Sequence, residues 1–230
     1  MRRVLLLVLS SLLLVPVTFA QSASRADNKP RTEFFIGYSY LRADGLPNLQ
    51  DNTFSDPKFG ERAGVHGIDT SVTRFITPRF GITGDFSFNQ NDRALTLSNG
   101  TGNFETRISS ALVGPTFKFV NDSRLSPFVR ALFGLANTRF DAEQQLTLGS
   151  SSQRNTLQTS ANDFAMALGG GLDVRLSNRV DLRVLQIDYN PIFLQDRSVN
   201  VLNGAGLIQP QRLIGQRQDN LRLSFGVVFR

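Results

Sequence analysis

The segment Leu221-Arg222-Leu223-Ser224-Phe225-Gly226-Val227-Val228-Phe229-Arg230 decides how this chain is expected to fold. All its odd-numbered positions are apolar, whereas the even-numbered positions hold two arginines, a serine, a glycine and one valine. This period of two is that of a β-strand, which places alternate side chains on opposite faces. A strand with an apolar outer face needs a partner at its edge, and a core or lipid against that face. We therefore expect this segment to close a transmembrane barrel by pairing with the first strand.

The first 20 residues have the pattern of a cleaved secretory signal peptide. The basic start Met1-Arg2-Arg3 precedes an apolar run from Val4 to Val15, and small residues stand three and one positions before the Ala20/Gln21 bond. The run is shorter than the roughly 20 residues that a membrane helix needs, which makes a membrane anchor the weaker alternative. Cleavage would remove two arginines and no acidic residue, so the net charge of +6 would fall to +4.

The composition of the remaining chain excludes several classes of protein. There is no cysteine, and hence no disulfide framework, lipoprotein anchor or thiolate metal site. No apolar stretch beyond residue 20 approaches the length of a membrane helix, but barrel strands carry their apolar residues only at alternate positions. We expect residues 21–32 to form a flexible lead-in and residues 33–230 to form one β-barrel domain.

Eight segments show strand-like alternation, and the connections between them alternate between long and short. In antiparallel order, every long connection lies at one end of the wall, as in bacterial outer-membrane barrels with short periplasmic turns and long external loops. No long stretch has the spacing of an amphipathic helix. The fold class expected is therefore all-β, an eight-stranded antiparallel up-and-down transmembrane β-barrel. The expected strands are residues 33–41, 64–75, 80–88, 107–119, 128–139, 164–176, 180–194 and 221–230.

Two further local features follow from the pattern. The alternation changes parity at Val184-Leu185, which predicts a β-bulge. Asn99-Gly100 and residues 149–152 have the composition of tight turns, which predicts that they form the tips of two long excursions.

Three stretches resemble a known family: Gly37-Tyr38-Ser39-Tyr40-Leu41, residues 80–86 and residues 164–177. They are similar to the small outer-membrane barrels of the opacity and outer membrane protein A type, and the resemblance spans residues 33–230. It implies an integral protein of the Gram-negative outer membrane with a structural or surface-interaction, adhesion-like role. It implies a monomer in contact with outer-membrane lipid, lipopolysaccharide and the assembly machinery, although Phe229 is penultimate where such barrels often end in an aromatic residue. No catalysis, cofactor or nucleic-acid binding is expected; the alternatives are a lipid A-modifying enzyme and a small porin-like channel.

His66 is the only histidine and the natural candidate for the enzyme alternative. Some small barrels modify lipid A with a histidine and serine or acidic partners near the external rim, and Asp69 and Ser71 are close in sequence. Asp69 is an odd number of residues from His66, so on a regular strand the two side chains face opposite ways. We therefore expect no catalytic residue and no metal site.

Arginine accounts for all but three of the 25 basic residues. Its planar guanidinium suits phosphate, so arginines near the outer rim are expected to contact lipopolysaccharide phosphates, with ordinary solvated loop charges as the alternative. The arginines expected there are Arg42, Arg62, Arg93, Arg107, Arg139 and Arg154.

Charged residues also fall on the inward face of the expected strands. An eight-stranded wall leaves room only for its own side chains, so opposite charges there would form a cross-linked structural network and leave no wide channel. The expected network comprises Asp69, Asp85, Arg130, Asp173, Arg175 and Arg222, with Lys118 also inward.

Overall fold

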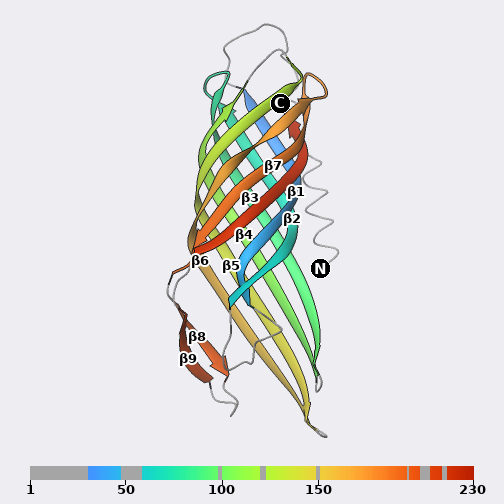
Figure 1. The fold of residues 1–230 in the computed structure, drawn as a ribbon, viewed down its shortest axis with the longest axis vertical. Coiled ribbons are helices and arrows are strands. Elements are labelled where there is room, and N and C mark those ends of the chain that lie inside the picture. Colours follow the sequence, from blue (N-terminus) through green and yellow to red (C-terminus); the bar gives the residue numbers. More distant parts are fainter. Residues whose placement is uncertain are drawn as a thin grey trace.

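In the computed structural model, the chain forms a closed barrel of eight antiparallel strands in the order β1-β10-β7-β6-β5-β4-β3-β2 (Figure 1). The structure describes residues 31–47, 59–97, 100–119, 123–148, 151–195, 197–202, 208–213 and 217–230. The expected signal peptide and residues 21–30 of the expected lead-in lie outside these ranges. The expected fold class is confirmed. The barrel strands are β1 (Thr32–Pro47), β2 (Phe59–Phe75), β3 (Phe80–Leu97), β4 (Gly100–Lys118), β5 (Leu125–Leu148), β6 (Ser151–Arg175), β7 (Val180–Phe193) and β10 (Arg217–Phe229).

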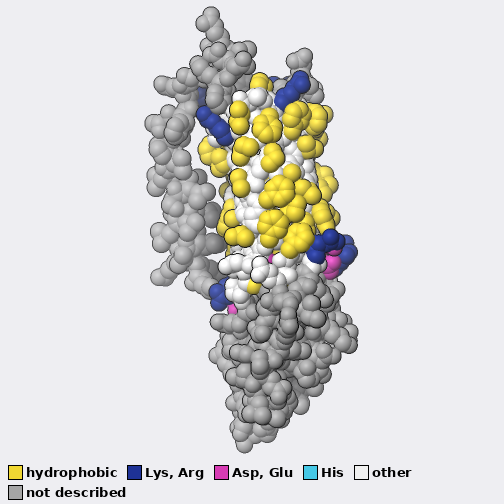
Figure 2. Space-filling model, turned by 90° about the vertical axis from the view of Figure 1, so that its left-hand side faces the viewer, with side chains coloured by type: hydrophobic (Ala, Val, Ile, Leu, Met, Phe, Trp, Pro, Cys, Tyr) yellow, Lys and Arg dark blue, Asp and Glu magenta, His cyan; other side chains and the backbone are white. Residues whose placement is uncertain are grey.

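The two faces of β10 are oriented as its sequence predicts, with the apolar face outward and the polar face inward. Phe225 is 54% exposed on the outside of the wall, whereas Arg222 and Ser224 are fully buried inside it. β10 pairs with β1 in the register Phe34↔Phe229 and Tyr38↔Phe225, which closes the barrel. The other strands repeat this division, so exposed apolar side chains form a belt around the barrel. Figure 2 shows one side of this belt.

The expected bulge in β7 is present. The pairing of β7 with β6 shifts register between Leu172 and Asp173, which face Leu185 and Arg183, and leaves Val184 as the extra residue. Val184 and Leu185 therefore both point outward although they are neighbours in sequence. Asp181 and Arg183 before the bulge, and Gln186 and Asp188 after it, all point into the barrel.

The strands are longer than the alternation indicates at one end of the barrel. β3 and β4 remain paired to Leu97↔Gly100, and β5 and β6 remain paired to Leu148↔Ser151, so most of these two expected loops is β-hairpin. Figure 1 shows both hairpins projecting from the lower end of the barrel. The expected last loop also contains a two-stranded sheet of β8 (Arg197–Leu202) and β9 (Ile208–Leu213). The alternation of apolar and polar residues ends before the strands end, because the part of a strand outside a membrane needs no apolar face.

The opposite end of the barrel has the expected short connections, between β2 and β3, β4 and β5, and β6 and β7. We call it the short-turn end, and the other the hairpin end. None of the described residues forms a helix long and apolar enough to cross a membrane.

Candidate functional site

The lumen contains a cluster of charges from five strands, which we call the arginine cluster: Arg130, Arg222, Asp69, Asp85 and Asp188. The Arg130 guanidinium lies 2.8 Å from Asp85 and 2.7 Å from Asp188. The Arg222 guanidinium lies 3.1 Å from Asp85 and 3.2 Å from Asp188. Asp69 is 3.9 to 4.0 Å from both arginines, and all five side chains are at most 1% exposed. Three carboxylates thus share two guanidinium groups away from water.

A second group, the lysine cluster, lies nearer the short-turn end. Lys118 Nζ is 2.9 Å from Glu33, 2.7 Å from Asp173 and 3.8 Å from Asp181. Arg183 Nε donates to Asp173 at 2.8 Å. Lys118 and its three carboxylate partners are at most 4% exposed. Arg230 lies 3.3 Å from Glu33 and also contacts Asp181, so three cations meet three carboxylates in this cluster.

Gln186 connects the two clusters. Its Oε1 accepts a hydrogen bond from Arg183 at 2.7 Å, and its Nε2 donates to Asp69 at 3.0 Å and to Asp188 at 2.9 Å. The charged interior is therefore one hydrogen-bonded network, in which the bond from Gln186 to Asp69 and the ion pairs of both clusters link different strands.

The structure brings four of the six expected network residues together in the arginine cluster and places Asp173 in the lysine cluster. Arg175 points inward at the short-turn mouth, but it forms no ion pair with a described carboxylate, and its Nε has no hydrogen-bond partner. Five inward residues of the network were not predicted from the sequence: Glu33, Asp181, Arg183, Gln186 and Asp188. Four of these flank the β7 bulge, so the change in parity was the signal that could have found them.

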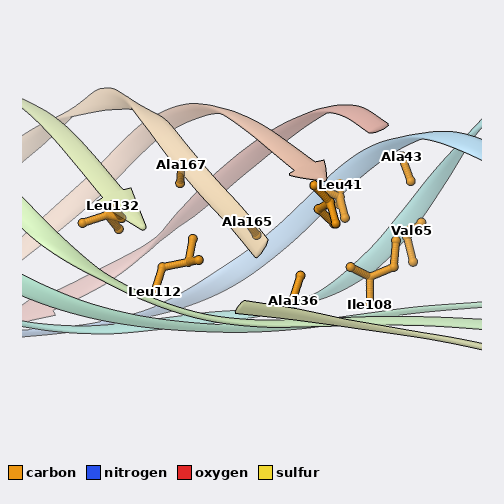
Figure 3. Packing of buried hydrophobic residues seen from close by; sticks show 10 residues of the cluster. Leu41, Ala43, Val65, Ile108, Leu112, Leu132, Ala136, Ala165 and Ala167 are labelled. Carbon is orange, nitrogen blue, oxygen red and sulfur yellow. The ribbon is translucent and has the colours of Figure 1, made fainter. Parts of the chain in front are cut away.

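Charge does not fill the whole lumen; toward the hairpin end a group of apolar side chains packs together (Figure 3), beside buried polar residues such as Asn190 and Asn220. Leu132 lies two positions beyond Arg130 on β5, and Ile192 lies four positions beyond Asp188 on β7, and both are fully buried. We call this group the apolar layer. The sequence did not predict this layer. Its members are Leu41, Ala43, Val65, Ile108, Leu112, Leu132, Ala136, Ala165, Ala167 and Ile192.

His66 lies on the outer surface of β2. The Tyr38 hydroxyl shares a hydrogen bond with His66 Nδ1, and the Tyr40 ring centroid lies 5.2 Å from the imidazole. Asp69 and Ser71 are buried on the inward face of the same strand. The structure therefore separates His66 from both residues that could have acted with it.

Three of the six arginines expected at the outer rim lie on the outer face near the hairpin end and pair with carboxylates. Arg62 pairs with Asp44 at 3.3 Å, and Arg139 pairs with Asp141 at 3.0 Å. Arg107 faces Arg139 across the strand pair and contacts Glu105. Arg42 is exposed on β1, while the side chains of Arg93 and Arg154 lie outside the described part of the structure.

Within the ranges that the structure describes, no group of three or more histidine, cysteine or acidic side chains is placed to hold a metal ion. The acidic groups of the lumen instead bind arginine and lysine. What this arrangement does chemically is to hold the wall together and fill its interior.

The fold is shared with solved outer-membrane barrels. The outer membrane protease OmpT of Escherichia coli matches with a TM-score of 0.52 and 7% identity over 91% of this chain and 99% of its own. The outer membrane protein OprG of Pseudomonas aeruginosa matches with a TM-score of 0.50 and 12% identity over 88% and 97%. No family model and no curated protein sequence matches this chain. At these identities the likeness establishes the fold, that of outer-membrane β-barrels.

Proposed function

We propose that this chain is an integral protein of the bacterial outer membrane, with a structural or surface-interaction role and no catalytic activity. The observation that carries the proposal is the outward apolar belt around a closed, side-chain-filled barrel. Phe34, Phe86 and Phe225 are each more than half exposed, and they lie on different strands. A contiguous apolar belt of this extent is stable against lipid and would aggregate in water.

The filled lumen supports a role at the surface over one in transport. Both charge clusters and the apolar layer occupy the interior, so a hydrated ion would have to displace paired charges and then lose its water. The hairpins β3–β4 and β5–β6, with the β8–β9 sheet, supply the surface available for contact outside the membrane. The separation of His66 from Asp69 and Ser71 supports a role without lipid A chemistry.

We also infer that Arg62, Arg107 and Arg139 meet lipopolysaccharide phosphates, and we extend this to Arg93 and Arg154 from their positions in β3 and β6. Each of the first three already has a carboxylate partner, so a phosphate would share the guanidinium with that carboxylate. Such shared contacts would be weak and sensitive to salt.

The experiment separates membrane residence from surface interaction. The native chain should fractionate with outer membranes and show a strand-dominated circular dichroism spectrum in detergent; recovery from the soluble periplasm would refute the proposal. A variant replaces residues 140–159 with Asn-Gly, a two-residue turn that keeps Arg139 opposite its partner Ser160 and preserves the rest of the barrel. If the surface-interaction role is right, bacteria that display this variant should bind immobilised extracellular proteins less than bacteria that display the native chain. Equal binding at equal display would leave only the structural role.

A further inference from the structure

The two arginines of the arginine cluster differ in how completely their donors are used. In Arg130, Nε and Nη2 donate to Asp188 at 3.0 and 2.7 Å, and Nη1 donates to Asp85 at 2.8 Å. Arg222 donates only from Nε and Nη2, both to Asp188, at 3.3 and 3.2 Å. Its Nη1 has no hydrogen-bond partner among the described residues, although the side chain is fully buried. Within this cluster, Arg222 Nη1 is therefore the guanidinium nitrogen that no carboxylate satisfies.

Two carboxylate oxygens of the same cluster are also unsatisfied. Asp69 Oδ2 accepts from the Ser224 hydroxyl at 2.8 Å and from Gln186 at 3.0 Å, and Asp85 Oδ2 accepts from Arg130. The other oxygen of each carboxylate, Oδ1, accepts no hydrogen bond from any residue that the structure describes. Both side chains are fully buried. Buried polar atoms in folded proteins nearly always have a partner, which is either protein or ordered water.

These three atoms lie close together. Arg222 Nη1 is 3.1 Å from Asp85 Oδ1 and 3.9 Å from Asp69 Oδ1. The shorter contact is an ion pair without the direction of a hydrogen bond, and the longer one exceeds hydrogen-bond length. A single small molecule beside Nη1 can therefore reach both oxygens.

The chemistry of the three atoms selects the molecule that fits between them. A guanidinium nitrogen only donates and an ionised carboxylate oxygen only accepts, so the occupant has to accept one hydrogen bond and donate two. Water does this, and three hydrogen bonds is the usual number for a buried water. A metal cation would be repelled by the guanidinium, and an anion would be repelled by the two carboxylates.

Unsatisfied polar groups continue from this point toward the hairpin end. Two positions from Asp69 on β2 is Gly67, which pairs with Ser39 on β1 and with Asn89 on β3. Ser39 is fully buried and Asn89 is 1% exposed. The Ser39 hydroxyl and both polar atoms of the Asn89 amide form no hydrogen bond within the described part of the chain. These three strands therefore offer further hydrogen bonds next to the cluster.

We propose that one water molecule is a permanent member of the arginine cluster. It accepts a hydrogen bond from Arg222 Nη1 and donates to Asp85 Oδ1 and Asp69 Oδ1. Asp69 is the carboxylate farthest from both guanidinium groups, and the water gives it the link to Arg222 that a direct distance of 3.9 Å does not provide. Ser39 and Asn89 supply the next hydrogen bonds to water that enters or leaves the site.

Solid-state NMR of the native chain in phosphatidylcholine liposomes tests the site, with 15N-labelled arginine and transfer of magnetisation from water protons to guanidinium nitrogens. Arg130 is the internal control, because it is equally buried in the same cluster but donates from all three nitrogens to carboxylates. The Arg222 Nη1 signal should receive magnetisation from water, and the Arg130 signals should receive none. Asp69→Leu should abolish the transfer to Arg222, because it replaces an acceptor by an apolar side chain. Asp69→Asn should keep the transfer, because an amide in either orientation bonds water.

Four outcomes would overturn the proposal. Absence of transfer to Arg222 would show a dry cluster, and equal transfer to Arg130 would show that water has no defined position there. Unchanged transfer in a folded Asp69→Leu variant would show that no water bridges to Asp69. In crystals grown with rubidium bromide, anomalous signal from rubidium or bromide at this position would show that the occupant is an ion. If Asp69→Leu fails to fold, the comparison of Arg222 with Arg130 in the native chain decides by itself.

Discussion

Arg222→Met is the substitution that tests most directly whether the arginine cluster holds the barrel together. Methionine fills a similar volume and leaves the neighbouring side chains in place, so the change removes chiefly the charge. The guanidinium of Arg222 is fully buried, 3.1 Å from Asp85 and 3.2 Å from Asp188. Its loss changes the cluster from three carboxylates with two guanidinium groups to three carboxylates with one.

The expected loss of unfolding free energy follows from what each carboxylate retains. Removing one partner of a buried ion pair destabilises a protein by about 3–5 kcal/mol, because a charge is left uncompensated. Asp188 keeps Arg130 and Gln186, and Asp69 keeps Ser224 and Gln186. Compensation by these groups places the expected loss near 3 kcal/mol, at the lower end of that range. Adding Asp85→Asn restores the original charge balance and should recover part of the loss.

Urea titration in phospholipid vesicles, followed by far-UV circular dichroism, measures this loss. Arg107→Met is the matched control, since Arg107 also pairs with a carboxylate but is 26% exposed on the outer face. An exposed pair of this kind contributes about 0–1 kcal/mol. Equal stability of the Arg222 and Arg107 variants would refute the view that the buried network holds opposite strands together.

The remaining predictions concern other parts of the wall. Gly67→Ala should lower the folded fraction on heat-modifiable gels, since its Cβ would meet the Phe88 carbonyl at 1.8 Å, while Gly84→Ala, with nothing within 4 Å, should fold normally; normal folding of both would contradict the close approach. Phe225→Asp should destabilise the lipid face by up to a few kcal/mol in the same urea titration, whereas Phe225→Leu should not, and equal midpoints would contradict the lipid contact. Leu132→Ala in the apolar layer should lose about 2–5 kcal/mol, and an unchanged midpoint would show that the layer packs loosely. His66→Ala should leave lipid A acylation unchanged by mass spectrometry; a changed acylation pattern with a folded barrel would support the enzyme alternative.

The parts of the fold in contact with lipid could be predicted from the sequence, because lipid requires an apolar residue at every second position. Because of that requirement, β10 and its pairing with β1 could be predicted. The bulge at Val184-Leu185 could also be predicted, because the apolar residues change there from even to odd positions. Outside the membrane the requirement ends, so the pairing of β5 with β6 as far as Leu148↔Ser151 left no trace in the alternation.

The interior was predictable only in part, because a filled lumen accepts either paired charges or apolar side chains. Asp85, Arg130 and Arg222 were found because buried charges need partners, and the strands offered both signs. Leu132 and Ile192 were not predicted, because the outward face of their strands is apolar too. An inward leucine or isoleucine then only lengthens an apolar run, and the sequence does not show that it points into the barrel. Which carboxylate meets which arginine depends on barrel tilt, which local spacing does not encode.

The same backbone hydrogen bond closes every strand pair at the short-turn end, which makes the strand pair the repeating unit of the barrel. β1 with β2, β3 with β4, β5 with β6, and β7 with β10 each end in the same carbonyl-to-amide bond between the two strands of the pair, so every pair is closed in the same way. In the fourth pair, the chain forms the β8–β9 sheet between its two strands, and the closing hydrogen bond is still present. Duplication of one pair would therefore add two strands with the closing bond kept in every pair, and would widen the barrel, because its diameter grows with the number of strands.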